Sequence, residues 1–319
     1  MRLFSIALSS AALLVAAYAE TATPSVAAAN AALQAGAADQ ALVLLNSLPS
    51  SAETHNLRCR VYFALERWDA AENECEEAVR LDGASAINHL WLGRALGEEA
   101  SRASFISAFS EAKKSRAEFE AAVRLDPDNA EAMADLGEFY SSAPGVVGGG
   151  EDKARGVVEQ LDRVDPARAY ELRGRIAESR KDYAIAEGEY KKAVEVSHHP
   201  AFQWMTLGSF YRKRERAAEA EAAVVNGAKA AQKDRTAGVA LFNGASVLTR
   251  SGRNLALAAK MLEDYLSGPV KTEEAPAFTA HVRLAQILVQ LGDKDEARKQ
   301  REEALALAHD YKPARDLKF

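Results

Sequence analysis

Gly148, Gly149 and Gly150 form the stretch of this sequence best suited to hold a phosphate group. Successive backbone N–H groups at the start of a helix attract anions, and glycine lets a ligand come close to the backbone. The segment lacks the GxxxxGK[ST] motif, and Glu151 and Asp152, which follow directly, carry charges that repel phosphate. We therefore interpret it as a connector or protein-contact loop whose acidic residues suit the first turn of the next helix.

Side chains capable of acid–base or nucleophilic chemistry are present but follow no recognisable pattern. The histidines other than His55 are scattered, with no HExxH or other metal-ligand spacing: His89, His198, His199, His281 and His309. No GxSxG motif supplies a nucleophile, and no pair among the 46 carboxylates can be given acid and base roles. The sequence predicts a protein that is not an enzyme and needs no cofactor.

Composition indicates the scaffold that must position these residues. Of 319 residues, 48% are hydrophobic and 66 are alanine, whereas β-branched residues are sparse. This favours helices and argues against an all-β fold or a parallel sheet. The 40 Lys and Arg residues against 46 Asp and Glu give a formal charge of −6. That sign is wrong for a phosphate backbone, so we expect no nucleic-acid partner.

The first 19 residues have the pattern of a secretory signal peptide. Arg2 precedes an apolar stretch over residues 3–17, and Ala17-Tyr18-Ala19 forms an A-x-A cleavage site. An uncleaved anchor and an ordinary first helix are the alternatives, but the stretch is shorter than the ~18–20 residues that span a membrane. We expect cleavage after Ala19 and an exported protein, periplasmic or secreted, with no transmembrane segment after cleavage.

A repeat of about 34 residues organises the rest of the chain. In the unit that starts at Ala201, positions 4, 7, 8, 11, 20 and 27 hold Trp204, Leu207, Gly208, Tyr211, Ala220 and Gly227. This pattern resembles the tetratricopeptide repeat (TPR) family, in which small residues at positions 8 and 20 let two antiparallel helices approach closely. Position 8 is occupied in turn by Ala29, Cys59, Gly93, Gly137, Gly174, Gly208, Gly244 and Ala285. Position 20 is occupied by Ala41, Ala71, Ser115, Ala154, Ala186, Ala220, Ala258 and Ala297.

The resemblance implies an all-α fold, a right-handed TPR superhelix of about eight helical hairpins over residues 20–309. We expect units near residues 22–51, 52–85, 86–129, 130–166, 167–200, 201–236, 237–274 and 278–309, followed by a C-terminal tail at 310–319. In the last unit, Arg301 replaces the apolar residue of position 24. That substitution fits a polar terminal cap with no repeat beyond it.

Two insertions distinguish this chain from a regular repeat array. The third unit has ten extra residues near 101–110, where the spacing of Phe105, Ile106 and Phe109 predicts a helical extension. The fourth unit has five extra residues within 143–152, which contain the three glycines. Their surroundings resemble a group of exported bacterial TPR proteins that share an inserted APGVVGGG loop and have no settled activity.

Cys59 and Cys75 occupy positions 8 and 24 of the second unit, levels that lie side by side in an antiparallel hairpin. In an exported protein this geometry favours a disulfide. Two buried thiols acting as small apolar side chains are an equally supported alternative. His55 lies one turn before Cys59, so His55, Cys59 and Cys75 could approach one metal ion, but three ligands without a fourth make this the weakest of the three interpretations.

Positions 2, 5, 9 and 12 of a TPR unit normally face the concave groove. The groove candidates read from these positions are Arg60, Leu90, Arg94, Glu138, Arg175, Met205 and Arg212. Four arginines in an acidic protein predict a groove that attracts carboxylates or acidic extended segments. The alternative is that these arginines pair with glutamates of neighbouring repeats.

We therefore expect a non-catalytic scaffold of the bacterial periplasm that holds a protein or peptide partner in its concave groove. A structural subunit of a cell-envelope assembly is an alternative. An enzyme with its site between the two inserts, residues 101–110 and 143–152, is a further alternative. It predicts a deep pocket with converging polar residues near Phe109 and Gly149.

Overall fold

The structure is a computed structural model that describes residues 24–234, 236–268 and 271–319, with Phe105 and Ile106 described by their backbone alone. The expected signal peptide, residues 1–19, lies outside the described residues. Within them the chain is all-α, with 17 α-helices and one short 3-10 helix, and contains no strand beyond a single bridge between Thr272 and Ala275. No helix in the described part is long and apolar enough to cross a membrane.

Consecutive helices pair into eight antiparallel hairpins. In chain order the pairs are α2 (Val26–Gln34) with α3 (Ala38–Asn46), α4 (Ala52–Ala64) with α5 (Trp68–Leu81), α6 (Ala86–Arg102) with α7 (Phe105–Leu125), α8 (Ala130–Ser142) with α9 (Glu151–Val164), α10 (Pro166–Ser179) with α11 (Tyr183–Val196), α12 (Pro200–Lys213) with α13 (Ala217–Ala231), α14 (Gly238–Arg250) with α15 (Leu255–Ser267), and α16 (Ala277–Leu291) with α17 (Lys294–Leu307). The 3-10 helix η1 (Gly145–Val147) lies between α8 and α9, and the short α18 (Lys312–Arg315) follows the last hairpin. The chain is a superhelical solenoid of TPR type.

Small residues bring the two helices of each hairpin together. All eight residues assigned to position 20 are 1% exposed or less, and all eight at position 8 are buried. In the third hairpin, Ser115 replaces alanine, and its hydroxyl donates to the carbonyl of Gly93 across the seam at 2.7 Å. The larger apolar residues fill the remaining space and form four clusters along the described part of the array.

The turns inside the hairpins repeat as well. Six of the eight have a residue with a left-handed backbone close to the end of their first helix: Gly36, Glu66, Lys181, Glu215, Gly252 and Gly292, with φ from 58° to 89°. Three of these are not glycine, although this conformation costs other residues about 1 kcal/mol or more. The repeat geometry therefore imposes the turn. The seventh turn has a second such residue, Asn254, and the longer loop of the fourth hairpin has Gly148 and Gly150 at positive φ.

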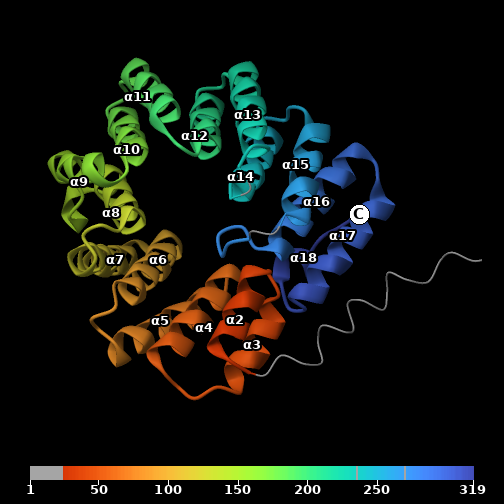
Figure 1. Ribbon diagram of the computed structural model, residues 1–319, viewed down its shortest axis with the longest axis horizontal. Coiled ribbons are helices and arrows are strands. Elements are labelled where there is room, and N and C mark those ends of the chain that lie inside the picture. The colour runs from red at the N-terminus through yellow and green to blue at the C-terminus, as the bar shows by residue number, and fades with distance from the viewer. Residues whose placement is uncertain (1–23, 235, 269–270) are drawn as a thin grey trace, which may run out of the picture.

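The first and last hairpins meet, so the solenoid closes into a ring (Figure 1). One apolar cluster contains Leu33, Leu45 and Val61 from the first two hairpins together with Phe278 and Tyr311 from the C-terminal end. Polar contacts cross the same junction. His309 donates its backbone N–H to Asp39 at 2.8 Å, and the Tyr311 hydroxyl donates to Glu66 at 2.9 Å.

This closure corrects two expectations for the C-terminus. Residues 310–319 are not a tail, because Tyr311 and Ala314 are buried in the cluster that joins the ends. Arg301 does not face open solvent at a free end either. Its Nε donates to the carbonyl of Ala314 at 3.0 Å, so the C-terminal helix α18 covers it.

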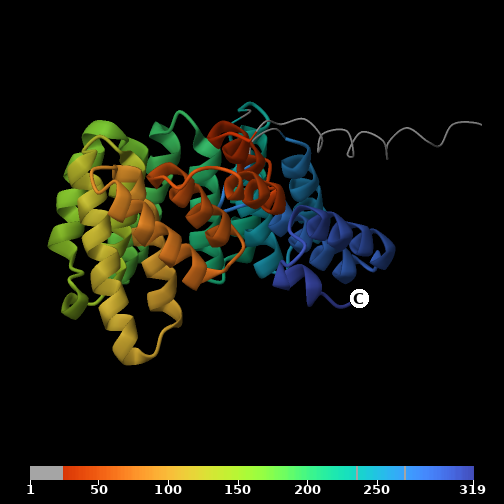
Figure 2. The same ribbon diagram turned by 90° about the horizontal axis from the view of Figure 1, so that it is seen from below.

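The two inserts lie next to each other on one edge of the ring. Helices α6 and α7 are the longest pair, with 17 and 21 residues, and Figure 2 shows them projecting beyond the other hairpins. The extension is helical, as its residue spacing predicts. Val147, in the loop between α8 and α9, is buried, so this loop packs against the body of the protein.

Candidate functional site

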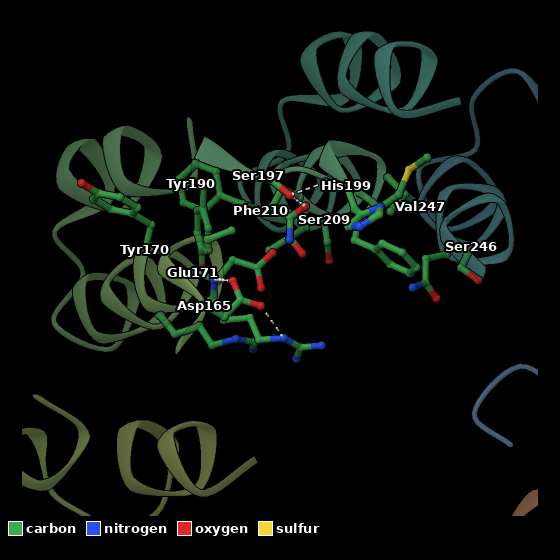
Figure 3. Close-up of a pocket in the computed structure, with 18 of the residues that line it drawn as sticks. Asp165, Tyr170, Glu171, Tyr190, Ser197, His199, Ser209, Phe210, Ser246 and Val247 are labelled. Carbon is green, nitrogen blue, oxygen red and sulfur yellow. Dashed lines mark hydrogen bonds and ion pairs between the residues drawn. The ribbon is translucent and has the colours of Figure 1, made fainter. Parts of the chain in front are cut away.

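The inner face of the ring is the candidate site, and it contains a larger and a smaller cavity. The larger one, of about 1230 Å³, lies along α10, α12 and α14. Figure 3 shows Glu171, Ser209 and Ser246 among the side chains that line it, with the aromatic rings of Tyr170, Tyr190 and Phe210 around them. Because it combines aromatic, hydroxyl, amide and charged groups over three repeats, this cavity suits an extended polar chain rather than a compact apolar ligand.

Three arginines of the larger cavity have no carboxylate partner within 4 Å in the described residues. They are Arg212 on α12, Arg250 on α14 and Arg283 on α16. Arg283 is the most constrained: its guanidinium lies 4.0 Å from the ring centroid of Phe242 and donates to the hydroxyl of Ser246. Burial, together with the nearby charge of Arg250, lowers the pKa of Arg283. The site therefore offers positive charge that an anionic ligand would stabilise.

The other charges of this cavity are already balanced. Arg175 pairs with Glu138 of the preceding repeat at 2.9 Å. Burial raises the pKa of Glu171, although Arg175 and Arg168 act in the opposite direction and Thr206 hydrogen-bonds to it. The Arg175–Glu138 pair matches the alternative in which groove arginines pair with carboxylates of neighbouring repeats. Both Arg175 and Arg212 were expected to bind a partner, but only Arg212 has no carboxylate within 4 Å among the described residues.

Arg60 and Arg94 meet an acidic segment of this same chain. The loop between α15 and α16 runs toward the inside of the ring, and its Glu273 forms an ion pair with Arg60. The next residue, Glu274, lies 3.1 Å from Nη1 of Arg94. Arg94 also pairs with Glu131 at 2.6 Å and with Asp135 at 2.7 Å, and burial raises the pKa of Asp135 despite this cation.

The smaller cavity, of about 760 Å³, lies where the inserts meet. Its walls come from α6, α7, α8 and the glycine loop and are largely apolar, with Phe109, Phe139 and Val147 among them. Charged residues also line it, among them Arg94, Asp135 and Glu274. The enzyme hypothesis requires polar residues that converge on one point. Here Arg94 pairs with Asp135 and with Glu274, and half of the other lining residues are alanine or phenylalanine, with three serines and two glutamates among the rest.

The backbone N–H groups of the glycine loop form hydrogen bonds with nearby backbone carbonyls of the same chain. The N–H groups of Gly148, Gly149 and Gly150 donate to the carbonyls of Gly145, Pro144 and Tyr140 at 2.9, 3.2 and 2.9 Å. Gly149 packs so closely on Ala143 that an added Cβ would overlap the Ala143 carbonyl oxygen. With its donors satisfied internally, the loop acts as a connector that shapes the smaller cavity rather than as a phosphate cradle.

The structure joins Cys59 and Cys75 in a disulfide, with 5.2 Å between their Cα atoms. With the two sulfurs bonded to each other, the nearby His55 has no thiolate beside it with which to form the metal site. Its Nδ1 contacts Glu74 at 2.6 Å, and disulfide sulfurs carry no thiolate to bind a metal. No group of three or more metal-ligating side chains occurs in the described part of the chain.

Other expected site residues lie in different environments. Leu90 and Met205 are only 1% and 3% exposed, so both are packing residues between repeats, although Met205 also borders the larger cavity. The side chains of Phe105 and Ile106 lie outside the described residues. Arg250 and Arg283 were not predicted, because they fall outside the usual groove positions, and neither were Glu273 and Glu274. The two adjacent glutamates in the long segment between the last two units were the available signal.

Comparisons with known proteins found a family match, a curated relative and similar solved structures. The family model of the tetratricopeptide repeat matches residues 278–311. Superkiller complex protein 3 from Mus musculus is 26% identical over 296 residues, which cover 88% of this chain but only 17% of that protein. Among solved structures, yeast Tom70 has a TM-score of 0.43 at 17% identity, over 81% of this chain and 61% of that chain. The C-terminal part of a TPR protein from Cytophaga hutchinsonii has a TM-score of 0.40 at 15% identity, over 92% and 100%.

Proposed function

Because the chain is a tetratricopeptide repeat protein, we propose that it is a non-catalytic scaffold that holds an extended, acidic segment of a partner protein on the inner face of the ring. The observation that carries this proposal is the larger cavity, in which Arg212, Arg250 and Arg283 lack carboxylate partners among the described residues. A repeat fold suggests protein interaction, and the unpaired arginines add the chemistry of the partner. Each charge-assisted hydrogen bond formed there would contribute about 1.5–3 kcal/mol.

Reversing two of these arginines is expected to remove partner binding. A photo-crosslinking residue at Asn243, an exposed position in the cavity, would capture partner segments from a bacterial envelope extract. We expect the wild-type cavity to capture segments rich in Asp and Glu, and Arg212→Glu with Arg250→Glu to reduce capture at least tenfold, because like charges then face each other. Mass spectrometry of the crosslinked peptides measures both results.

The matched control reverses two exposed arginines that line neither cavity. Arg124 and Arg163 are exposed and have no ion pair among the described residues, so Arg124→Glu with Arg163→Glu makes the same change in net charge away from the cavity. We expect this control to capture partners as the wild type does. Equal capture by both double variants, or captured segments that are basic or apolar, would overturn the proposal.

We also propose that the protein works outside the cytoplasm, in the bacterial periplasm. The A-x-A pattern at residues 17–19 and the paired cysteines support export, because disulfides persist in oxidising compartments. One measurement checks both features. The intact mass of the full-length chain expressed in a bacterium is expected to match a protein that starts at Glu20, and to rise by about 2 Da on reduction, the mass of two hydrogens. An unprocessed N-terminus would contradict export, and no change on reduction would contradict the disulfide.

A further inference from the structure

The loop of residues 271–276 occupies part of the inner face with its own carboxylates. Glu273 is 6% exposed, forms an ion pair with Arg60, and has Nε2 of Gln34 3.4 Å from its carboxylate. Glu274 reaches Arg94 from the same turn of chain. The loop is held at its base by the hydroxyl of Tyr265, which donates to the carbonyl of Ala275. An acidic turn, closed by the bridge between Thr272 and Ala275, is therefore already bound here, supplied by the protein itself.

The surface that receives this segment is a platform of Arg60, Trp91 and Arg94. The two guanidinium groups lie 5.4 Å and 4.7 Å from the ring centroid of Trp91, which is itself 3% exposed. Cation–π contact with one indole holds both arginines in place, so their N–H groups point at a pair of neighbouring carboxylates. This arrangement contacts two adjacent acidic residues that are presented by a tight turn.

The loop fits this platform incompletely. Nε of Arg60 and the hydroxyl of Thr272 are buried without a hydrogen-bond partner. The Glu274 side chain is 48% exposed and shares Arg94 with Glu131 and Asp135. A buried donor without a partner costs about 1–3 kcal/mol. A ligand that accepts from Nε of Arg60 would remove that cost on the platform, and release of the loop would let water reach the Thr272 hydroxyl, so both groups favour displacement.

We propose that the platform is a second binding site for the acidic segment of the partner, and that the loop of residues 271–276 is a tethered competitor which the partner displaces. This inference rests on the proposed function, since it assumes that the inner face binds an acidic chain. Glu274 borders both cavities. Displacing the loop would therefore join the larger cavity to the smaller, apolar one, and the partner segment would carry two adjacent carboxylates followed by an apolar side chain.

Tethering explains why such a site stays closed to weak ligands. A loop attached at both ends competes at an effective concentration on the order of millimolar, so a free peptide with similar contacts cannot replace it. Removing the two carboxylates of the loop removes this competition while leaving the platform intact. Variants of the loop therefore test whether it competes with a ligand for the platform.

The experiment uses the chain from residue 20 onward and a fluorescein-labelled peptide with the sequence of residues 268–279. We expect the double variant Glu273→Gln with Glu274→Gln to bind this peptide at least tenfold more tightly than the wild type, measured by fluorescence anisotropy. Adding Arg60→Gln and Arg94→Gln is expected to abolish the gain. A peptide with glutamine in place of both glutamates is expected not to bind any of these proteins.

The matched control is Glu302→Gln with Glu303→Gln, an exposed adjacent pair on α17 that is distant in sequence from the loop. It is expected to leave peptide binding at the wild-type level. The inference is overturned if the loop variant gains no affinity, if the gain survives loss of Arg60 and Arg94, or if the loop variant opens the ring, as an increased radius of gyration in X-ray scattering would show. The last result would identify the loop as a permanent strut.

A single change, Glu274→Gln, keeps the question answerable if the double variant does not fold. Glu274 is the more exposed of the two glutamates, and we expect its removal to raise peptide affinity about threefold; no rise overturns the inference. Failure here is distinguishable from failure of the proposed function. If Arg212→Glu with Arg250→Glu abolishes partner capture while the loop variants gain nothing, the acidic-segment scaffold stands and the tethered competitor is rejected.

Discussion

Replacing Phe278 with alanine is expected to separate the two ends of the ring. Phe278 is 1% exposed and lies in the apolar cluster that contains Leu33 and Leu45 of the first hairpin. Its ring centroid is 4.7 Å from that of Tyr311, whose hydroxyl reaches Glu66. Most members of this cluster belong to residues 29–65, at the opposite end of the sequence. Removing a buried phenylalanine costs about 3–5 kcal/mol, and here that cost weakens the junction between the two ends.

The measurement is hydrogen exchange combined with small-angle X-ray scattering. In a repeat array each hairpin contacts mainly its neighbours, so we expect faster exchange in α2, α3 and α16 to α18, with α8 to α13 unchanged, together with an increased radius of gyration. Phe210→Ala is the matched control, because Phe210 is also buried, at 2% exposure, but lies in the middle of the array. A Phe278 variant with unchanged scattering and terminal exchange would show that closure does not depend on this cluster.

Ring closure could not be read from the sequence, because it joins residues that lie more than 200 positions apart. Asp39 meets His309, and Arg60 meets Glu273. Asp39, His309 and Glu273 are ordinary residues for a helix end or loop, and Arg60 lies at a usual groove position, so none of them points to the other end of the chain. Arg301 illustrates the difficulty: a charged residue at an apolar repeat position has the same local appearance whether solvent or a folded-back helix lies beside it.

The hairpins, in contrast, were predictable from residue types alone. A small residue at position 8 opposite another at position 20 is a local requirement, since both lie within one unit and determine how closely two helices approach. The same holds for the helical insert, whose apolar residues follow helical spacing. The candidate site was predictable only in part. Groove positions identified Arg94, Arg175 and Arg212, but which arginine stays unpaired depends on carboxylates of other repeats and of the loop at 271–276.

Close contact between helices at position 8 predicts a second large effect. Replacing glycine with alanine is expected to lower the free energy of unfolding at Gly174 and to raise it at Gly188. A Cβ added at Gly174, on α10, would lie 2.6 Å from Cε1 of Tyr190. That ring is 2% exposed and is fixed by a hydrogen bond of 2.6 Å from its hydroxyl to Glu178, so it cannot move aside. A Cβ at Gly188, on α11, meets nothing within 4 Å.

We therefore expect Gly174→Ala to lower the free energy of unfolding by about 1–3 kcal/mol, the usual cost of overpacking a core. Gly188→Ala should raise it by about 0.5–1 kcal/mol, because alanine favours a helix interior over glycine. Urea denaturation followed by circular dichroism compares the two variants with the wild type. Since both changes add the same methyl group to a helix, opposite signs isolate the effect of the helix–helix contact. If Gly174→Ala stabilises the protein as Gly188→Ala does, the seam has room for a side chain, and close approach at position 8 does not hold the fifth hairpin together.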